Sequence, residues 1–111
     1  MVRSFRVRLE DIADAIAGID ALLAGVDLSA FSQSWPMQRA VERGLEIISE
    51  ASRSLPDDQK LQHPGVPWTQ IAGIGNILRH EYHRVEPTIV WNITKTHMPE
   101  LARAIQQMLA D

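Results

Sequence analysis

Residues 68–85 read WTQIAGIGNILRHEYHRV, and the spacing of their side chains predicts an amphipathic helix. Apolar residues recur at steps of three and four, at Ile71, Ile74, Leu78, Tyr82 and Val85. On a wheel turning about 100° per residue, the polar side chains gather on the opposite side, at Asn76, Arg79, His80 and His83. We therefore expect one face of this helix to be buried and the other to face outward.

Three further segments show the same helical periodicity, and prolines and glycines separate them. The first carries apolar residues from Leu9 to Leu23 and ends before Gly25, a residue that tolerates the left-handed conformation. The second begins with Ser34 as its cap and Pro36 in its first turn, and Pro56 ends it. The last starts near Pro87 and is interrupted at Pro99. Residues 57–67, DDQKLQHPGVP, predict a polar loop.

These segments predict an all-α fold, an antiparallel bundle of four or five helices formed by one domain over residues 1–111. Glycines inside two of the helical patterns, at Gly44, Gly73 and Gly75, weaken them slightly but permit close approach to the backbone. Alternation at period two and hairpin turns, which would indicate strands, do not occur.

Composition excludes several classes of function. Hydrophobic residues make up 45% and charged residues 23%, which argues against a disordered chain. The absence of cysteine excludes disulfides, thiolate metal sites and a cysteine nucleophile. We expect no signal peptide, no membrane contact and a cytoplasmic location. Because the net charge is −3, an RNA-binding role requires a local basic cluster or an oligomer that pools its charges.

The polar face of residues 76–83 is the candidate for chemistry. Asn76 and His80 are four residues apart, as are Arg79 and His83, so each pair consists of neighbours on a helix surface. Histidine changes charge near neutral pH, and arginine binds phosphate. RNA supplies its own 2′-hydroxyl nucleophile, so cleavage needs a base, an acid and a cation, with no metal and no cofactor. One helix is too small to surround a phosphate, so we expect a two-fold dimer that apposes two such helices. The alternative is a solvated helix face.

Other residues carry weaker signals. His80 and His83 have a spacing compatible with shared metal ligation, but no third ligand is clearly placed, although Glu81 is close in sequence. The basic group Arg3, Arg6 and Arg8 is suited to phosphate contacts, yet a frayed terminus is the favoured interpretation. Core packing is favoured over base stacking for the aromatic residues Phe5, Phe31, Trp35, Trp68 and Trp91.

Four stretches together resemble the HepT-like branch of the HEPN superfamily. Residues 73–85, GIGNILRHEYHRV, are similar to its signature helix, and residues 65–76, GVPWTQIAGIGN, to the junction leading into it. Residues 40–52, AVERGLEIISEAS, resemble its second helix, and residues 89–105, IVWNITKTHMPELARAI, its tryptophan-containing fourth helix. The resemblance implies a homodimeric, metal-independent endoribonuclease that is the toxin of a toxin–antitoxin pair. It implies as antitoxin an MntA-like nucleotidyltransferase, which adds AMP to a tyrosine of the toxin.

The family signature is arginine, a polar residue, three further positions, histidine, any residue and tyrosine. The match implies that Asn76 is the polar residue, His80 the catalytic histidine and Tyr82 the modified tyrosine, whereas Gly75 occupies the position of the arginine. Two explanations stay open. Arg79 supplies the cation from about one turn further along the helix, with His83 as an accessory group. Alternatively, the chain has lost nuclease activity and keeps its dimer and a nucleotidyltransferase-binding surface. A nucleotide-binding helical domain is a third possibility, because HEPN relatives do not all cleave RNA.

Tyr82 falls near the apolar side of the wheel, away from His80. A tyrosine that accepts AMP must be reachable, so we expect a dimer cleft to expose the tip of this amphipathic side chain. The alternative is a core tyrosine with a hydrogen-bonded hydroxyl.

Overall fold

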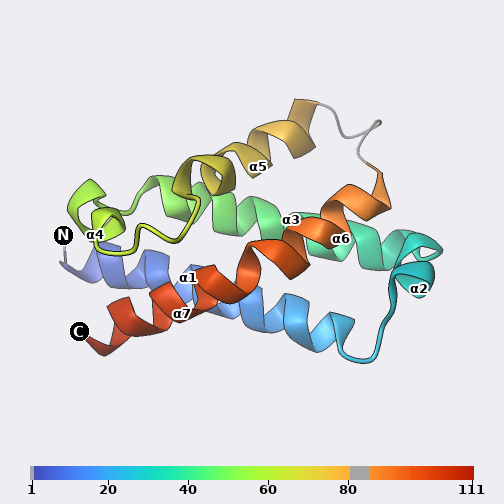
Figure 1. Cartoon of the computed structure of the whole chain (residues 1–111), viewed down its shortest axis with the longest axis horizontal. Coiled ribbons are helices and arrows are strands. Elements are labelled where there is room, and N and C mark those ends of the chain that lie inside the picture. Colours follow the sequence, from blue (N-terminus) through green and yellow to red (C-terminus); the bar gives the residue numbers. More distant parts are fainter. Residues whose placement is uncertain (1, 81–85) are drawn as a thin grey trace.

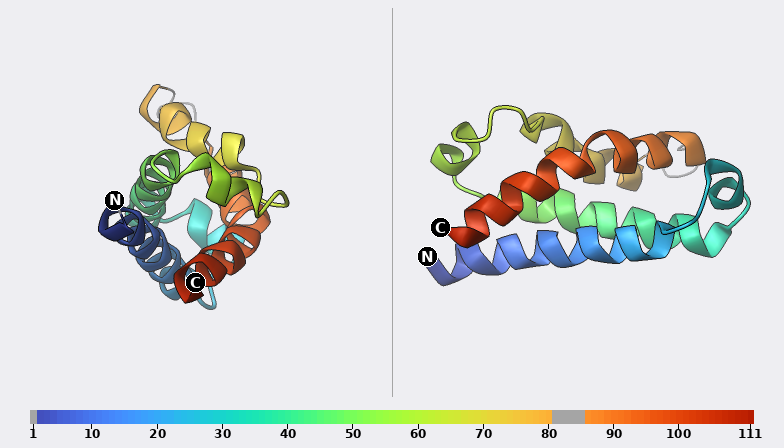
Figure 2. Two further views of the ribbon diagram at one scale, coloured as in Figure 1. Left: turned by 90° about the vertical axis from the view of Figure 1, so that its left-hand side faces the viewer. Right: turned by 60° about the horizontal axis from the view of Figure 1, so that its bottom comes forward.

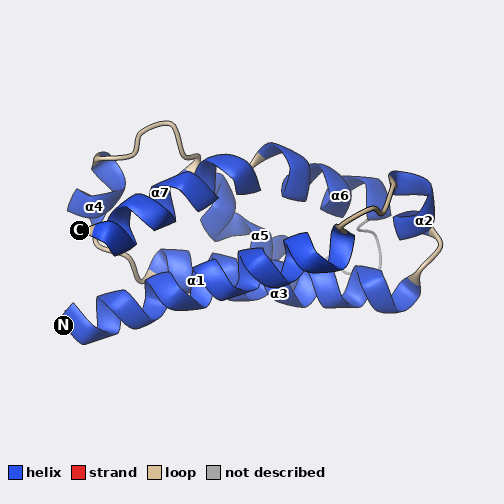
Figure 3. Cartoon of the chain, turned by 90° about the horizontal axis from the view of Figure 1, so that it is seen from below, coloured by secondary structure: helices blue, strands red, loops and turns tan. Residues whose placement is uncertain are grey.

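The computed structural model describes residues 2–80 and 86–111, with the side chains of residues 5–79 and 86–111. Within these ranges it contains seven α-helices and no strand (Figure 3). Five helices have ten or more residues: α1 (Val2–Leu23), α3 (Trp35–Arg53), α5 (Trp68–His80), α6 (Pro87–Thr96) and α7 (Met98–Ala110). Two have five residues each: α2 (Leu28–Ser32) and α4 (Asp57–Leu61). The prediction of an all-α bundle is confirmed.

Helix α3 is the central element of the bundle. It packs against α1 on one side and α5 on the other, and α1 also packs against α7 (Figures 1 and 2). Consecutive long helices run in opposite directions, with α6 and α7 together forming the last, bent rod (Figure 1). Both ends of the chain lie at the same end of a molecule that measures 41 × 29 × 23 Å.

The apolar stripes predicted from the sequence form one continuous core. Each long helix contributes aliphatic side chains at steps of three and four, and burial of one such side chain stabilises the fold by roughly 1.5–3 kcal/mol. The core residues with 0% exposure are Ile12, Phe31, Val41, Leu45, Ile48, Ile71, Val90, Leu101 and Ile105. The predicted close helix contact is found at Gly44, where an added Cβ would lie 2.9 Å from Ile19 Cδ1.

The predicted helix boundaries are confirmed where caps and prolines define them. Ser34 caps α3, because its Oγ accepts a hydrogen bond from the Met37 N–H at 3.3 Å. Gly25 follows α1 with φ of +74°, the left-handed conformation expected of a helix stop. Pro99 lies in the first turn of α7, and a single residue, His97, separates α7 from α6.

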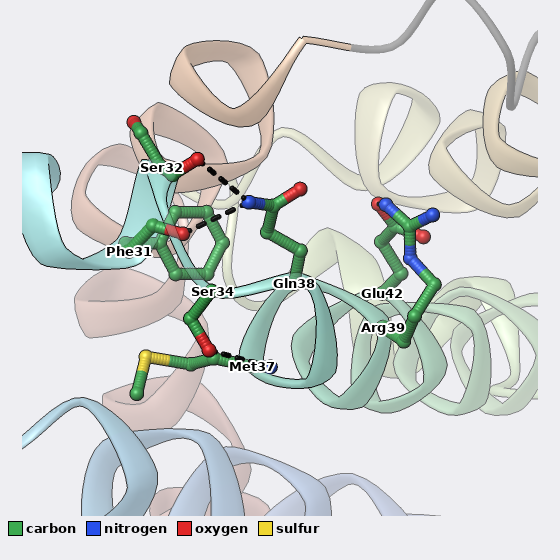
Figure 4. A network of polar contacts seen from close by, with 7 residues as sticks. All are labelled: Phe31, Ser32, Ser34, Met37, Gln38, Arg39 and Glu42. Carbon is green, nitrogen blue, oxygen red and sulfur yellow. Dashed lines mark hydrogen bonds and ion pairs between the residues drawn. The ribbon is translucent and has the colours of Figure 1, made fainter.

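The corner between α2 and α3 is held by a glutamine (Figure 4). The Gln38 Nε2 donates hydrogen bonds to the carbonyl oxygens of Phe31 at 3.0 Å and Ser32 at 3.1 Å, near the end of α2. The Phe31 ring is fully buried and lies 5.5 Å from the Trp91 ring, measured between centroids. These contacts fix the short helix α2 over the end of the core.

Three sequence-based expectations are wrong. Residues 57–61 form α4 instead of loop, since Asp57 and Asp58 in its first turn interact favourably with the positive end of the helix dipole. Helix α1 begins at Val2, so the frayed-terminus interpretation fails and Arg8 lies well inside a helix. Trp35 is 66% exposed and lies beneath the guanidinium of Arg39, 5.4 Å from its ring centroid, so it is not a core residue. Cation–π contact with arginine lets an exposed indole remain partly covered.

Candidate functional site

Helix α5 is joined to α3 by a hydroxyl group that contacts its backbone. Ser49 of α3 is 1% exposed, and its Oγ accepts a hydrogen bond from the Gly75 N–H at 3.0 Å. The same Oγ donates to the Ala72 carbonyl at 2.8 Å. The buried hydroxyl thus donates one hydrogen bond and accepts another, both with backbone groups of α5. This arrangement fixes how α5 is placed along α3.

Arg53 adds a second contact to the same carbonyl. Its Nε and Nη2 donate to the Ala72 oxygen at 3.1 and 2.8 Å. Arg53 is exposed, so these bonds lie at the edge of the helix contact, whereas those of Ser49 lie inside it. We call the set of Ser49, Arg53, Ala72 and Gly75 the α3–α5 polar seam.

Gly75 leaves a space that Arg79 enters. A Cβ added at residue 75 would lie 3.2 Å from Arg79 Nη1, 3.1 Å from Ser49 Oγ and 3.4 Å from Ser49 Cβ. The Arg79 side chain therefore extends back along α5 by one turn, so that its guanidinium lies where a side chain at residue 75 would begin. A glycine fits here because the space beside its backbone is already occupied.

The described part of α5 has the predicted two faces. Ile71, Ile74 and Leu78 are buried, whereas Asn76 and Arg79 are exposed on the outward face. His80 is the last residue of α5, and its side chain lies outside the described residues. Tyr82 and His83 also lie outside them, so the contacts Asn76–His80 and Arg79–His83 remain predictions.

A charged hollow lies beside Arg79, between α1, α3 and α5. Its volume is about 370 Å³. Arg8 and Asp11 of α1 form one rim and Arg79 of α5 the other, with Arg43, Glu46 and Glu50 of α3 between them. Ile47 and Ala51 of α3 are the apolar residues of its lining. We call this feature the α1–α3–α5 hollow.

Arg79 and Arg8 are predicted from the sequence as candidate phosphate contacts, whereas Ser49, Arg53 and Arg43 are not. A signal for Ser49 exists, since it stands four residues after Leu45, on the apolar stripe of α3. A hydroxyl on an apolar stripe needs a partner, which predicts a polar contact between helices. Arg43 and Arg53 give no such signal, because arginine on an outward helix face is ordinary.

Elsewhere in the described residues, we find no second group of catalytic side chains. A larger hollow of about 610 Å³ lies between α4 and the start of α5, beside Trp68, whose Nε1 donates to the carbonyls of Lys60 and His63. Within the described residues, no three His, Asp or Glu side chains are grouped so as to hold a metal ion. The proposed ligand pair His80 and His83 falls outside the described side chains. None of the helices in residues 2–80 and 86–111 has the length and hydropathy of a membrane span.

Comparison with known proteins gives consistent matches over nearly the whole chain. The family described as "Ribonuclease HepT-like" matches residues 12–108. The chain is 36% identical to "Probable ribonuclease HepT" of Thermococcus cleftensis, over 97% of this chain and 98% of that protein. It is 31% identical to "Putative RNase MJ1380" of Methanocaldococcus jannaschii, over 94% and 95%. It is 34% identical to "Putative RNase TTE0752" of Caldanaerobacter subterraneus subsp. tengcongensis, over 94% and 93%. No solved structure matches it.

Proposed function

The chain belongs to the HepT-like ribonuclease family, and from this premise we propose that it is a metal-independent endoribonuclease with a composite site in a homodimer. In this proposal His80 is the general acid and base, Arg79 is the phosphate-binding cation, and Asn76 orients the substrate. His83 is an accessory group.

The observation that carries the proposal is the position of the Arg79 guanidinium. The signature arginine of the family would stand at residue 75, where this chain has glycine. Arg79 Nη1 lies 3.2 Å from the position that a Cβ at residue 75 would occupy. The Arg79 side chain, which starts one turn later on the helix, therefore places a guanidinium close to the position of the signature arginine. Gly75 and Arg79 are therefore a matched pair, and the glycine is compatible with activity.

The chemistry follows from the substrate and these groups. One His80 imidazole takes the proton of a ribose 2′-hydroxyl, whose oxygen attacks the adjacent phosphorus. The bond from phosphorus to the 5′-oxygen breaks, and the His80 imidazolium of the second protomer gives that oxygen a proton. The products are a 2′,3′-cyclic phosphate and a 5′-hydroxyl end. Arg79 stabilises the charge that develops on the phosphate oxygens, an effect worth about 10²–10³-fold for one removed donor.

A dimer fits the exposed face of α5. Ile77 lies on that face next to Asn76 and is 46% exposed. A partner helix placed on this face would cover Ile77 and bring two copies of Asn76, Arg79 and His80 together about a two-fold axis. The homodimer thus supplies the second imidazole that the mechanism requires.

Regulation by a partner forms the second half of the proposal. An MntA-like nucleotidyltransferase is the antitoxin, and it inactivates the toxin by adding AMP to Tyr82. This tyrosine is two residues from His80 in the sequence, so a nucleotide attached to it would add a negative phosphate beside the site for RNA.

The decisive experiment is RNA cleavage by purified protein in the presence of a chelator. We expect the wild type to cleave total RNA, His80→Ala to be inactive and Arg79→Ala to lose about 10²–10³-fold in rate. Arg103→Ala, on the exposed side of α7, is the charge-matched control and is expected to cleave at the wild-type rate.

A swap of the two positions tests the role of Arg79 specifically. In the Arg79→Ala background, Gly75→Arg places a guanidinium at the signature position, and we expect it to restore part of the lost rate. Absence of cleavage by the wild type would disprove the nuclease and favour the alternative, an inactive binding partner of a nucleotidyltransferase. Full activity of Arg79→Ala would show that the cation lies elsewhere.

A further inference from the structure

The α1–α3–α5 hollow is lined by charged side chains, most of which form no ion pair within the described residues. Three guanidiniums and three carboxylates line it, but the one ion pair among them joins Arg43 Nη1 to Glu46 Oε1 at 3.7 Å. Within the described side chains, Arg8, Arg79, Asp11 and Glu50 take part in none of the side-chain hydrogen bonds and ion pairs. Opposite charges that face one hollow without pairing leave donors and acceptors available to a ligand.

The charge balance of the lining restricts the ligand. Because the lining has three positive and three negative groups, its formal net charge is zero, so it does not favour an isolated anion. A suitable ligand carries an anion for the arginines and also hydrogen-bond donors for the carboxylates. A ribonucleotide has both: a phosphodiester, and the donors of the ribose 2′-hydroxyl and of the base amino or imino groups.

The two apolar residues in the lining of the hollow suit contact with a flat ring. Ile47 is half-buried and Ala51 is buried, so together they offer an apolar surface between the charged rims. The volume of about 370 Å³ lies within the range of small-molecule sites. The arginine fork matches phosphate oxygens in a bidentate way.

Resting on the nuclease function proposed above, we infer that the α1–α3–α5 hollow is a subsite for a nucleotide of the bound RNA strand that flanks the cleaved phosphate. Arg79 faces both this hollow and the space beside Gly75, so it links the subsite to the reacting group. Arg8 and Arg43 bind the flanking phosphate, Asp11 and Glu50 accept from ribose or base donors, and the base lies on Ile47 and Ala51. The α1, α3 and α5 helices lie side by side in this order, so the strand runs across them (Figure 2).

Salt-dependent RNA binding tests the two arginines that are outside the catalytic machinery. The His80→Ala protein binds a short labelled single-stranded RNA without consuming it, and Arg8→Gln and Arg43→Gln are introduced into it separately. We expect each to raise the Kd about five- to tenfold, since a charge-assisted bond is lost. We expect each to reduce the slope of log K against log salt concentration by about 0.7. DNA of the same sequence is expected to bind more weakly.

Arg103→Gln is the matched control for Arg43→Gln. The Arg103 side chain is 67% exposed and pairs with Glu100 at i−3, and that of Arg43 is 72% exposed and pairs with Glu46 at i+3. The control is expected to leave both Kd and slope unchanged. If Arg8→Gln and Arg43→Gln match the control, the subsite is refuted while the cleavage experiment still stands.

NMR of Ile47, which lines the hollow, gives a measurement that does not depend on cleavage. In the wild-type protein, a nucleoside 3′-monophosphate is expected to shift the NMR signal of the Ile47 δ1 methyl group. The signal of Ile93, which is half-buried on α6, is expected to stay in place. A shift of Ile47 in a protein that cleaves no RNA would refute the nuclease and leave the hollow as a nucleotide-binding site only. An equal shift with inorganic phosphate alone would overturn the nucleotide assignment, and no shift of Ile47 would overturn the subsite.

Discussion

The two largest helix contacts of α3, with α1 and with α5, each include a glycine, yet they differ in what fills the space beside it. At the α1–α3 contact, a Cβ on Gly44 would lie 2.9 and 3.0 Å from Ile19 Cδ1 and Cγ1, so its two nearest neighbours are apolar. At the α3–α5 polar seam, the neighbours of Gly75 are the hydroxyl of Ser49 and the guanidinium of Arg79. One contact is non-directional packing, and the other is a set of directional hydrogen bonds.

This difference suggests that the α1–α3 contact contributes mainly to the stability of the fold, whereas the α3–α5 polar seam fixes the position of α5. An apolar contact tolerates small shifts along the helix, since dispersion and hydrophobic burial depend weakly on direction. A hydroxyl that must meet one N–H and one carbonyl accepts a narrow range of positions. The polar seam therefore suits the helix that carries Arg79 and His80, and the apolar contact suits the helix that completes the core.

We expect the largest loss of stability and activity when a side chain is added at Gly75 in the polar seam. Gly75→Val places branched carbons against Ser49 and Arg79, and we expect the free energy of unfolding to fall by about 2 kcal/mol through overpacking. We also expect RNA cleavage to fall at least as far as in Arg79→Ala, because the guanidinium is displaced. Chemical denaturation and cleavage rates measure the two effects.

Gly73→Val is the control on the same helix. Nothing lies within 4 Å of a Cβ added at residue 73, so the valine meets no neighbour in the described chain. If Gly73→Val and Gly75→Val lower the free energy of unfolding equally, the cause is a general effect on α5 and the close contact at Gly75 is not what matters.

We expect the second-largest loss of stability when the Ser49 hydroxyl is removed from the polar seam. Ser49→Ala removes the two hydrogen bonds that the buried hydroxyl makes to the Gly75 N–H and the Ala72 carbonyl, and we expect the free energy of unfolding to fall by about 1–1.5 kcal/mol. The hydroxyl of Ser52 is equally buried but donates to Ser49 O within its own helix. We therefore expect Ser52→Ala to cost less, and amide hydrogen exchange at Gly75 to accelerate in Ser49→Ala alone. Equal exchange in both variants would contradict a specific role for Ser49.

A smaller effect is expected at the apolar contact. Gly44→Ala forces Ile19 to move, but its Cδ1 is the end of a flexible side chain, so we expect a loss of about 1 kcal/mol. Ile19→Val removes the contacting methyl and is expected to recover part of that loss in a double variant. RNA cleavage should stay at the wild-type rate in each of these proteins. A drop in cleavage without a change in stability would show that the α1–α3 contact also positions the site.

We expect the smallest loss of stability at Arg53, the exposed residue of the polar seam. Arg53→Gln removes two bonds to the Ala72 carbonyl, which keeps its bond from Ser49. We expect a loss of about 0.5–1 kcal/mol by thermal or chemical denaturation. A loss larger than that of Ser49→Ala would reverse the assignment of the buried hydroxyl as the main contact.

The helices and their buried faces were predictable because periodicity is a local property. The spacing of Ile71, Ile74 and Leu78 is enough to identify the inward face of α5, and Ser34 and Gly25 identify helix ends. The partner of Ser49 in the polar seam was not predictable, since Ser49 and Gly75 are 26 residues apart and meet only in one helix register. The hollow was missed for the same reason, because Arg8, Arg43 and Arg79 come from three helices.

The neighbouring ends of the chain have a practical consequence. Arg6 Nη1 of α1 donates to the Leu109 carbonyl of α7 at 3.4 Å, and both termini lie at the same end of the bundle (Figure 1). A short flexible linker can therefore join the two ends of one copy, so a circularly permuted chain with new ends in a surface loop is expected to keep the bundle.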